Sequence, residues 1–253
     1  MANAFIVIGT QRTGSSALAI ALAKHPDVFA GWEWMLDIPV WKKLAVAQEG
    51  LERSFVNLVE ADRKHIEAEY RRQRFIGFRW LFRSSAKWVL HPRFSPALAI
   101  DRLETFIDWA RREDSLKVIH IVRNDNVAWL QSKEMSRSSG LYIGKEYPKE
   151  LRVEIDVREA LKRIRSKNWV DARLGSLEGT GRYLRVRFED FARNNDQVAR
   201  DALGFLGCDL DGLPSFDASI RRQNRSRSDG DTVLNYEPLR IALAERNLLL
   251  SSF

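Results

Sequence analysis

The pattern of apolar and polar positions divides the chain into alternating strands and helices. Short apolar runs predict strands at 4–9, 28–30, 74–82, 117–122 and 183–188. The run KVIHIV is almost continuously apolar, which is typical of a parallel strand that is buried on both faces. Such a strand requires covering layers on both sides of its sheet.

Between these strands, apolar residues recur at the spacing of amphipathic helices. The predicted helices cover residues 14–24, 51–73, 99–113, 125–136, 156–177 and 196–206. Because strands and helices alternate, the connections are crossover units and the sheet is parallel. We expect an α/β fold of three layers, with a central, mostly parallel sheet flanked by helices.

Two polar stretches do not fit this alternation. SRSSGLYIGKEYPKE (136–150) and RRQNRSRSDGD (221–231) are rich in Ser, Gly, Arg or Lys and predict mobile loops. No internal repeat and no linker-like stretch divides the chain, and 253 residues are enough to bury one large core. We therefore expect residues 1–253 to form a single domain.

Composition narrows the class of protein. Hydrophobic residues make up 45% and charged residues 30%, which excludes a collagenous or wholly disordered chain. No apolar run reaches the roughly 18 to 20 residues that span a bilayer, and no signal-peptide pattern opens the sequence. We expect a cytoplasmic protein with no membrane span. Cys208 is the only cysteine, so it has no partner in the chain for a disulfide and a cysteine zinc site is not expected.

The charge balance points to an anionic partner. There are 41 Lys and Arg against 34 Asp and Glu, a net charge of +7. Long-range attraction of this sign favours nucleic acid, a membrane surface or a phosphorylated small molecule. The charge alone does not distinguish these partners.

The stretch FIVIGTQRTGSSAL runs a predicted strand through a turn into a helix. Gly9 and Gly14 allow the tight turn, Ser15 and Ser16 provide hydroxyl donors, and Arg12 provides a cation. Backbone N–H groups and the helix dipole favour an anion at such a place. The lysine of the G-x-x-x-x-G-K-[ST] motif is missing, since Ser15 follows Gly14. The stretch is therefore either a phosphate loop for a ligand other than ATP or only a tight connection.

A second stretch, VIHIVRNDNVAWLQS, also runs a buried strand into a helix. It places Arg123 at the strand end and Ser132 along the helix. Each residue alone is unremarkable, but their position at a second strand end makes them candidates for a second phosphate clamp. His120 lies inside the apolar strand, where a hydrogen-bonded core residue is expected rather than a catalyst.

In these two stretches the chain resembles the sulfotransferases that use 3'-phosphoadenosine 5'-phosphosulfate (PAPS). GTQRTGSS is similar to that family's loop for the 5'-phosphosulfate, and IVRNDNVAWLQS to its 3'-phosphate segment. Four further segments are similar to family segments in the same order: LAKHPDVFAGWE, FIGFRWLF, LRVRFEDF and LGFLGCDL. The resemblance covers most of the chain and is closest to the bacterial carbohydrate branch, which includes enzymes acting on trehalose and nodulation factors. It implies a P-loop-like fold.

The resemblance implies which residues bind the donor. The phosphosulfate loop comprises Arg12, Thr13, Gly14, Ser15 and Ser16. A sulfuryl group does not need the bridging Mg²⁺ of ATP chemistry, so N–H groups, hydroxyls and one cation suffice and no metal is expected.

The second clamp departs slightly from the family pattern. The resemblance implies that Arg123 and Ser132 bind the 3'-phosphate. Ser132 lies nine residues after Arg123, where the cytosolic aryl-type enzymes usually have eight. Arg225, in the basic run near the end of the sequence, is a further candidate for this phosphate.

The catalytic set implied by the resemblance is Glu33, Arg12 and Arg79. Glu33 follows the His-Pro segment and would act as the general base for the acceptor hydroxyl; the alternative is a solvated loop glutamate. Arg79 would stabilise charge on the bridging oxygen; the alternative is a structural ion pair. Trp32 and Trp34 flank Glu33 and would stack on a sugar or aromatic acceptor unless they belong to the core.

The sequence thus predicts a sulfotransferase that moves a sulfuryl group from PAPS to a hydroxyl of a carbohydrate or related small-molecule acceptor and releases PAP. One alternative is an ATP-dependent small-molecule kinase, which would need Mg²⁺ and normally the loop lysine. The other is a non-catalytic nucleotide or nucleic-acid binder that uses the positive charge. The sequence leaves open the acceptor and the oligomeric state, for which a homodimer is one alternative.

Overall fold

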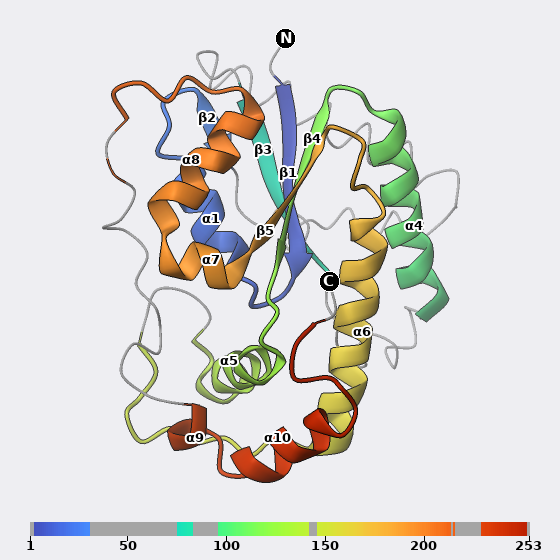
Figure 1. Cartoon of the computed structure of the whole chain (residues 1–253), viewed down its shortest axis with the longest axis vertical. Helices are drawn as coiled ribbons and strands as arrows, with labels where there is room; N and C mark the ends of the chain where they lie inside the picture. Colours follow the sequence, from blue (N-terminus) through green and yellow to red (C-terminus); the bar gives the residue numbers. More distant parts are fainter. Residues whose placement is uncertain are drawn as a thin grey trace.

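The computed structural model describes residues 3–30, 75–82, 96–141, 146–213, 215 and 229–251. In this part of the chain five strands form one sheet in the order β2-β3-β1-β4-β5, and every neighbouring pair is parallel (Figure 1). The strands are β1 (Asn3–Thr10), β2 (Val28–Ala30), β3 (Phe75–Phe82), β4 (Leu116–Val122) and β5 (Tyr183–Arg187). The predicted parallel sheet is confirmed.

The register brings the carboxyl ends of the strands to one edge of the sheet. Thr10 at the end of β1 pairs with Phe82 at the end of β3. Val122 at the end of β4 pairs with Arg187 at the end of β5. The two stretches with candidate phosphate-binding residues therefore leave the sheet at the same edge, from the neighbouring strands β1 and β4.

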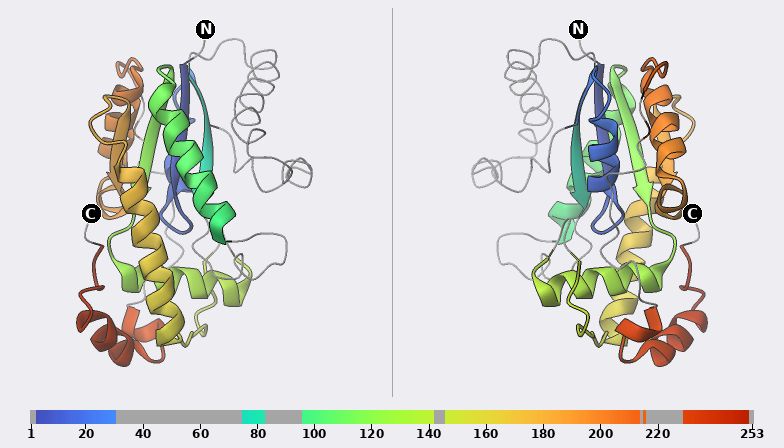
Figure 2. Two further views of the ribbon diagram at one scale, coloured as in Figure 1. Left: turned by 90° about the vertical axis from the view of Figure 1, so that its right-hand side faces the viewer. Right: turned by 90° about the vertical axis from the view of Figure 1, so that its left-hand side faces the viewer.

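Helices cover both faces of the sheet. They are α1 (Ser15–Leu22), α4 (Pro96–Arg112), α5 (Asn126–Ser139), α6 (Val157–Gly175), α7 (Phe188–Arg193), α8 (Asn195–Leu206), α9 (Asp229–Thr232) and α10 (Tyr236–Ala244). Figures 1 and 2 show α1, α7 and α8 on one face and α4 and α6 on the other, which confirms the three layers. None of the helices in the described ranges is long and apolar enough to cross a membrane.

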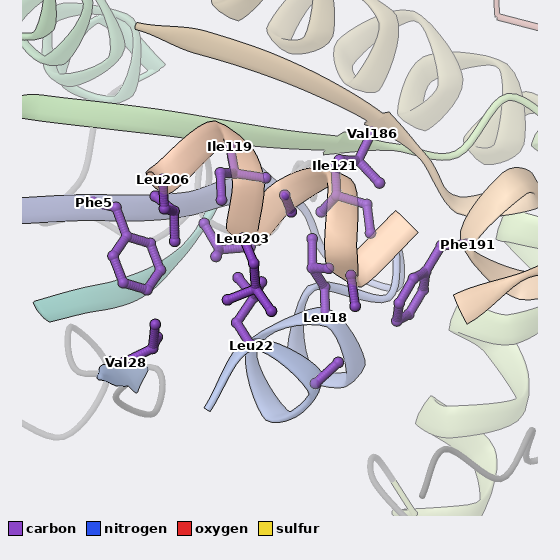
Figure 3. Packing of buried hydrophobic residues seen from close by; sticks show 14 of the residues in the cluster. Phe5, Leu18, Leu22, Val28, Ile119, Ile121, Val186, Phe191, Leu203 and Leu206 are labelled. Atoms are coloured by element: carbon purple, nitrogen blue, oxygen red, sulfur yellow. The ribbon is translucent and has the colours of Figure 1, made fainter. Parts of the chain in front are cut away.

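The central strand β1 is buried on both faces. Phe5 and Val7 belong to the core cluster shared with α1 and α8 (Figure 3), and Ile6 and Ile8 belong to the cluster shared with α4 and α6. Successive side chains of a strand point to opposite faces, so the continuous apolar run fills both cores. Burying each of these large side chains contributes about 1.5 to 3 kcal/mol.

A third cluster supports the helix that crosses the carboxyl edge of the sheet. In Figures 1 and 2, α5 lies across this edge with α10 beneath it. Trp129 and Leu130 of α5 pack in one cluster with Ile164 of α6 and with Leu239 and Leu243 of α10. All five side chains are fully buried. This packing gives α5 a rigid support beside the candidate site.

The structure corrects several predicted boundaries. The loop predicted at 136–150 is wrong in part, because α5 continues to Ser139 and Tyr147 is buried. The loop predicted at 221–231 is also wrong in part, because α9 begins at Asp229. The strand predicted to end at 188 ends one residue earlier, since Phe188 begins α7, and α10 is missing from the prediction. The predicted helix at 51–73 lies outside the described residues.

Candidate active site

The loop between β1 and α1 depends on two glycines. Gly14 has a φ of +89°, and a Cβ atom there would lie 2.6 Å from a ring carbon of Phe188. A Cβ atom on Gly9 would lie 2.5 Å from the carbonyl oxygen of Ile121. Both distances are shorter than a Cβ atom tolerates, so the loop reaches this tight approach to β4 and α7 only with glycine at these positions.

Arg12 connects this loop to α5 and to the segment that follows α5. Its φ is +68°, in the left-handed region that non-glycine residues rarely adopt. Its Nε donates to the Ser132 Oγ at 3.1 Å, and its Nη2 donates to the Tyr147 hydroxyl at 2.9 Å. The guanidinium therefore uses two of its nitrogens to contact two side chains that are more than 100 residues away in the sequence.

The first turn of α1 provides donors at the end of the loop. The residue before the helix, Gly14, has no side chain to cap it. The first N–H groups of a helix have no partners within the helix, and they attract an anion. Ser15 is buried and Ser16 is half-buried. Thr13 is fully buried and its hydroxyl donates to the Thr10 carbonyl at 2.8 Å, so this side chain stabilises the turn itself.

Arg123 lies directly beside the same loop. It follows β4, and its Nη1 donates to the Arg12 carbonyl at 3.3 Å. Its guanidinium carbon lies 4.5 Å from the centre of the Phe188 ring, which is within the range of a cation–π contact. The structure thus brings together Arg12, Arg123 and Ser132, which the sequence analysis assigns to two separate phosphate clamps.

Two acidic side chains near Arg123 accept backbone N–H groups. Glu189 of α7 accepts from the N–H groups of Asn124 and Asp125, at 2.9 and 3.0 Å from one carboxylate oxygen. Asp125 caps α5 by accepting from the Ala128 N–H at 2.9 Å. Both carboxyl groups therefore have backbone N–H partners within a region that is otherwise suited to anions.

Three residues of this region were not singled out by sequence reasoning. Trp129 donates its indole N–H to the Gln11 carbonyl at 2.7 Å, Tyr147 binds Arg12, and Glu189 binds the turn after Arg123. The sequence does mark Glu189 as a candidate, because it is an acidic residue that directly follows the predicted strand at 183–188. Nothing in the local sequence marks the other two.

Buried ionisable groups lie between β4, β5 and α6. The Lys167 ammonium is 3.2 Å from the Asp171 carboxylate, and both side chains are at most 1% exposed. Burial lowers the pKa of Lys167, and the charge of Asp171 opposes that change. His120 is fully buried, with Nδ1 2.7 Å from the Tyr183 hydroxyl and Nε2 3.4 Å from Asp171. His120 is a hydrogen-bonded core residue, as predicted.

The remaining predicted site residues are not brought together by the described structure. Arg79 belongs to β3, where its backbone pairs with Val7 of β1, three residues before the end of the strand. Glu33 and Arg225 lie outside the described residues, as do Trp32 and Trp34. Within the described ranges, no group of three or more His, Cys, Asp or Glu side chains could hold a metal ion.

Comparison with known proteins decides the family. The model of the sulfotransferase family matches residues 4–212, which is most of the chain. The chain belongs to the sulfotransferase family. No curated protein matches it significantly.

Solved sulfotransferase structures have the same fold. The sulfotransferase from Alicyclobacillus acidocaldarius is 19% identical, with 87% of each chain covered and a TM-score of 0.50. The sulfotransferase domain from the curacin biosynthetic pathway is 14% identical, with 98% of this chain and 92% of that chain covered and a TM-score of 0.50. The three-layer arrangement of this sulfotransferase is therefore the P-loop-like fold of the family.

Family membership also identifies the sulfuryl donor. PAPS is the standard donor of the family, so the protein is a PAPS-dependent sulfotransferase. The described residues fit such a ligand. Hydrogen-bond donors gather at one edge of the sheet: the guanidinium groups of Arg12 and Arg123, the uncapped N-terminus of α1 and the hydroxyl of Ser16. Gly14 leaves the position before the helix without a side chain. The match does not support the kinase or the non-catalytic binder.

Proposed function

We propose that this sulfotransferase transfers the sulfuryl group of PAPS to a hydroxyl of a carbohydrate or related small-molecule acceptor. The observation that supports the proposal most is that the loop between β1 and α1 contacts both α5 and the turn after β4. Arg12 contacts Ser132 at 3.1 Å, and Arg123 contacts the Arg12 carbonyl at 3.3 Å. A nucleotide with phosphates on both its 3' and 5' positions suits two cations on segments that contact each other in this way.

On the donor side, each loop has one phosphate to bind. The backbone of residues 9–16, the hydroxyls of Ser15 and Ser16, and Arg12 bind the 5'-phosphosulfate. Arg123 and Ser132 bind the 3'-phosphate, and Arg225 is a further candidate for it. Forked guanidinium donors suit both groups, because each presents several anionic oxygens.

On the acceptor side, Glu33 accepts the proton of the attacking hydroxyl while the new oxygen–sulfur bond forms. The bond between sulfur and the bridging oxygen of the 5'-phosphate breaks, and PAP leaves with that oxygen. Arg12 and Arg79 stabilise the negative charge that grows on the bridging oxygen. The support for Glu33 is the segment LAKHPDVFAGWE, which is similar to the His-Pro segment and acidic residue of the carbohydrate branch. Its flanking tryptophans suit stacking on a sugar ring.

The acceptor class is tested with labelled PAPS and pools of hydroxyl compounds. We expect label to pass from PAPS to carbohydrate-containing acceptors, also in the presence of EDTA. We expect no label to pass to them when ATP labelled on its γ-phosphate replaces PAPS. Aryl alcohols and amines are the comparison pools. Transfer to these pools alone would contradict the carbohydrate assignment, and a requirement for a divalent cation would contradict the metal-free loop.

Nucleotide choice tests the two clamps separately. We expect PAP to bind at least about ten-fold more tightly than 5'-AMP, because only PAP has the 3'-phosphate and a hydrogen bond to a charged group is worth about 1.5 to 3 kcal/mol. Calorimetry measures both affinities. In Arg123→Ala most of the advantage of PAP should be lost while 5'-AMP binding stays nearly the same. Equal affinities of the wild-type protein for PAP and 5'-AMP would contradict the two-clamp assignment.

A further inference from the structure

The segment 248–251, named here the strap, lies against the turn that follows Arg123. The Ser251 N–H donates to the Asn124 carbonyl at 2.9 Å, and the Asn126 N–H donates to the Leu249 carbonyl at 3.1 Å. These two hydrogen bonds flank an antiparallel bridge between Asp125 of the turn and Leu250 of the strap. The strap therefore pairs with the backbone of the turn as a short strand would.

The Ser251 side chain anchors the strap to a buried charge. Its Oγ accepts from the Lys167 ammonium at 2.7 Å and lies 3.0 Å from the Asn168 side-chain oxygen and 3.3 Å from that of Asn126. Lys167 is in turn paired with Asp171 inside the protein. Ser251 thus links the start of α5 to the middle of α6 through a single hydroxyl.

The turn after Arg123 is held from a second side by α7. Glu189 accepts from the N–H groups of both Asn124 and Asp125. Between them, Glu189 and the strap bind both N–H groups and the Asn124 carbonyl. The backbone next to Arg123 therefore has little conformational freedom, and the Arg123 side chain extends from a backbone that is held in place.

We propose that the strap is a positioning part of the 3'-phosphate site, with Ser251 as the residue that connects it to the buried anchor. A side chain on a fixed backbone loses less conformational entropy when it binds a ligand than one on a loose turn. Loosening the strap should therefore weaken binding of the 3'-phosphate and leave the 5'-phosphate loop unaffected. The inference rests on the proposed function in one respect, namely that Arg123 binds the 3'-phosphate.

Ser251→Ala tests the inference by removing the hydroxyl and leaving the backbone pairing. We expect PAP affinity to fall by about three- to ten-fold, the net scale of one typical intramolecular hydrogen bond, while 5'-AMP affinity stays within about two-fold. Ser251→Thr keeps the hydroxyl and should restore most of the PAP affinity. Ser176→Ala is the matched control, because the Ser176 hydroxyl also accepts from a cation, Arg111, but at the far end of α6. It should change neither affinity.

The outcomes separate this inference from the proposed function. If Arg123→Ala removes the preference for PAP and Ser251→Ala does not reduce it, only the positioning role of Ser251 is overturned. A Ser251→Ala protein that loses PAP and 5'-AMP equally would also overturn it, because a general loosening of the fold would explain that result. If Arg123→Ala leaves the preference intact, the assignment of Arg123 fails and the inference fails with it.

Discussion

Replacing Glu33 by glutamine is expected to lower sulfuryl transfer by about 10² to 10⁴ fold, which is the contribution of a general base to turnover. Glutamine keeps the shape of the side chain but cannot accept the proton of the acceptor hydroxyl. The turnover number at saturating PAPS and acceptor is the measurement. The affinity for PAP should barely change, because in the proposed mechanism Glu33 faces the acceptor and not the nucleotide.

The pH profile provides an independent readout for Glu33. The wild-type rate should fall as the pH drops through the titration of the Glu33 carboxylate, and Glu33→Gln should lack that part of the profile. Glu154→Gln, at an exposed carboxylate, is the matched control and should behave as the wild type. A Glu33→Gln protein that binds PAP normally and retains more than about a third of the wild-type rate would eliminate Glu33 as the base. The search would then move to the neighbourhood of Arg79.

Arg12→Ala is expected to reduce kcat/KM for PAPS by about 10 to 150 fold, since it removes a charge-assisted contact worth about 1.5 to 3 kcal/mol. Alanine keeps the Cβ atom, so the left-handed backbone at this position stays under the same restriction. Stability should change little, because a partly exposed cation contributes little to it. Steady-state kinetics and thermal unfolding measure the two effects.

Arg12→Lys distinguishes charge from geometry. Lysine retains the cation but lacks the planar fork that reaches Ser132 and Tyr147 through two nitrogens, so partial recovery is expected. Full recovery would show that charge alone matters at this position. Unchanged kinetics in a folded Arg12→Ala protein would mean that the loop is only a connection between β1 and α1, and the donor site would have to be sought elsewhere.

Much of the fold is predictable because the chain uses strong local patterns. The run in β4 is apolar at nearly every position, and burial on both faces of a parallel sheet requires that pattern. The tight loop between β1 and α1 is predictable because Gly9 and Gly14 lie five residues apart between a strand and a helix. The close approach of both glycines to their neighbours explains why those positions lack side chains.

The rest of the candidate site depends on contacts that no local pattern marks. Tyr147 lies in a polar stretch that predicts a loop, yet it is buried in the third core cluster. Its hydroxyl accepts from Arg12 and lies 2.6 Å from the Ser136 Oγ. The strap is equally unmarked, since its role depends on Lys167 and on the turn after β4. The contribution of such residues to the site can be recognised only from a three-dimensional structure, because their partners are distant in the sequence. The roles of the donor-site residues, Arg12 to Ser16, Arg123 and Ser132, stay predictions, as do those of Glu33, Arg79 and Arg225.

The central position of β1 also determines when the protein can fold during synthesis. Among the described strands β1 is made first, but its sheet neighbours are residues 75–82 and 116–122. At a synthesis rate of about 5 to 20 residues per second, roughly 6 to 22 seconds pass between the synthesis of the apolar run at 5–8 and that of its second neighbour, β4. Pairings this distant in sequence also form slowly after synthesis. Aggregation of the nascent chain through β1, rather than weak packing in the native state, is therefore the expected obstacle to producing this enzyme in quantity.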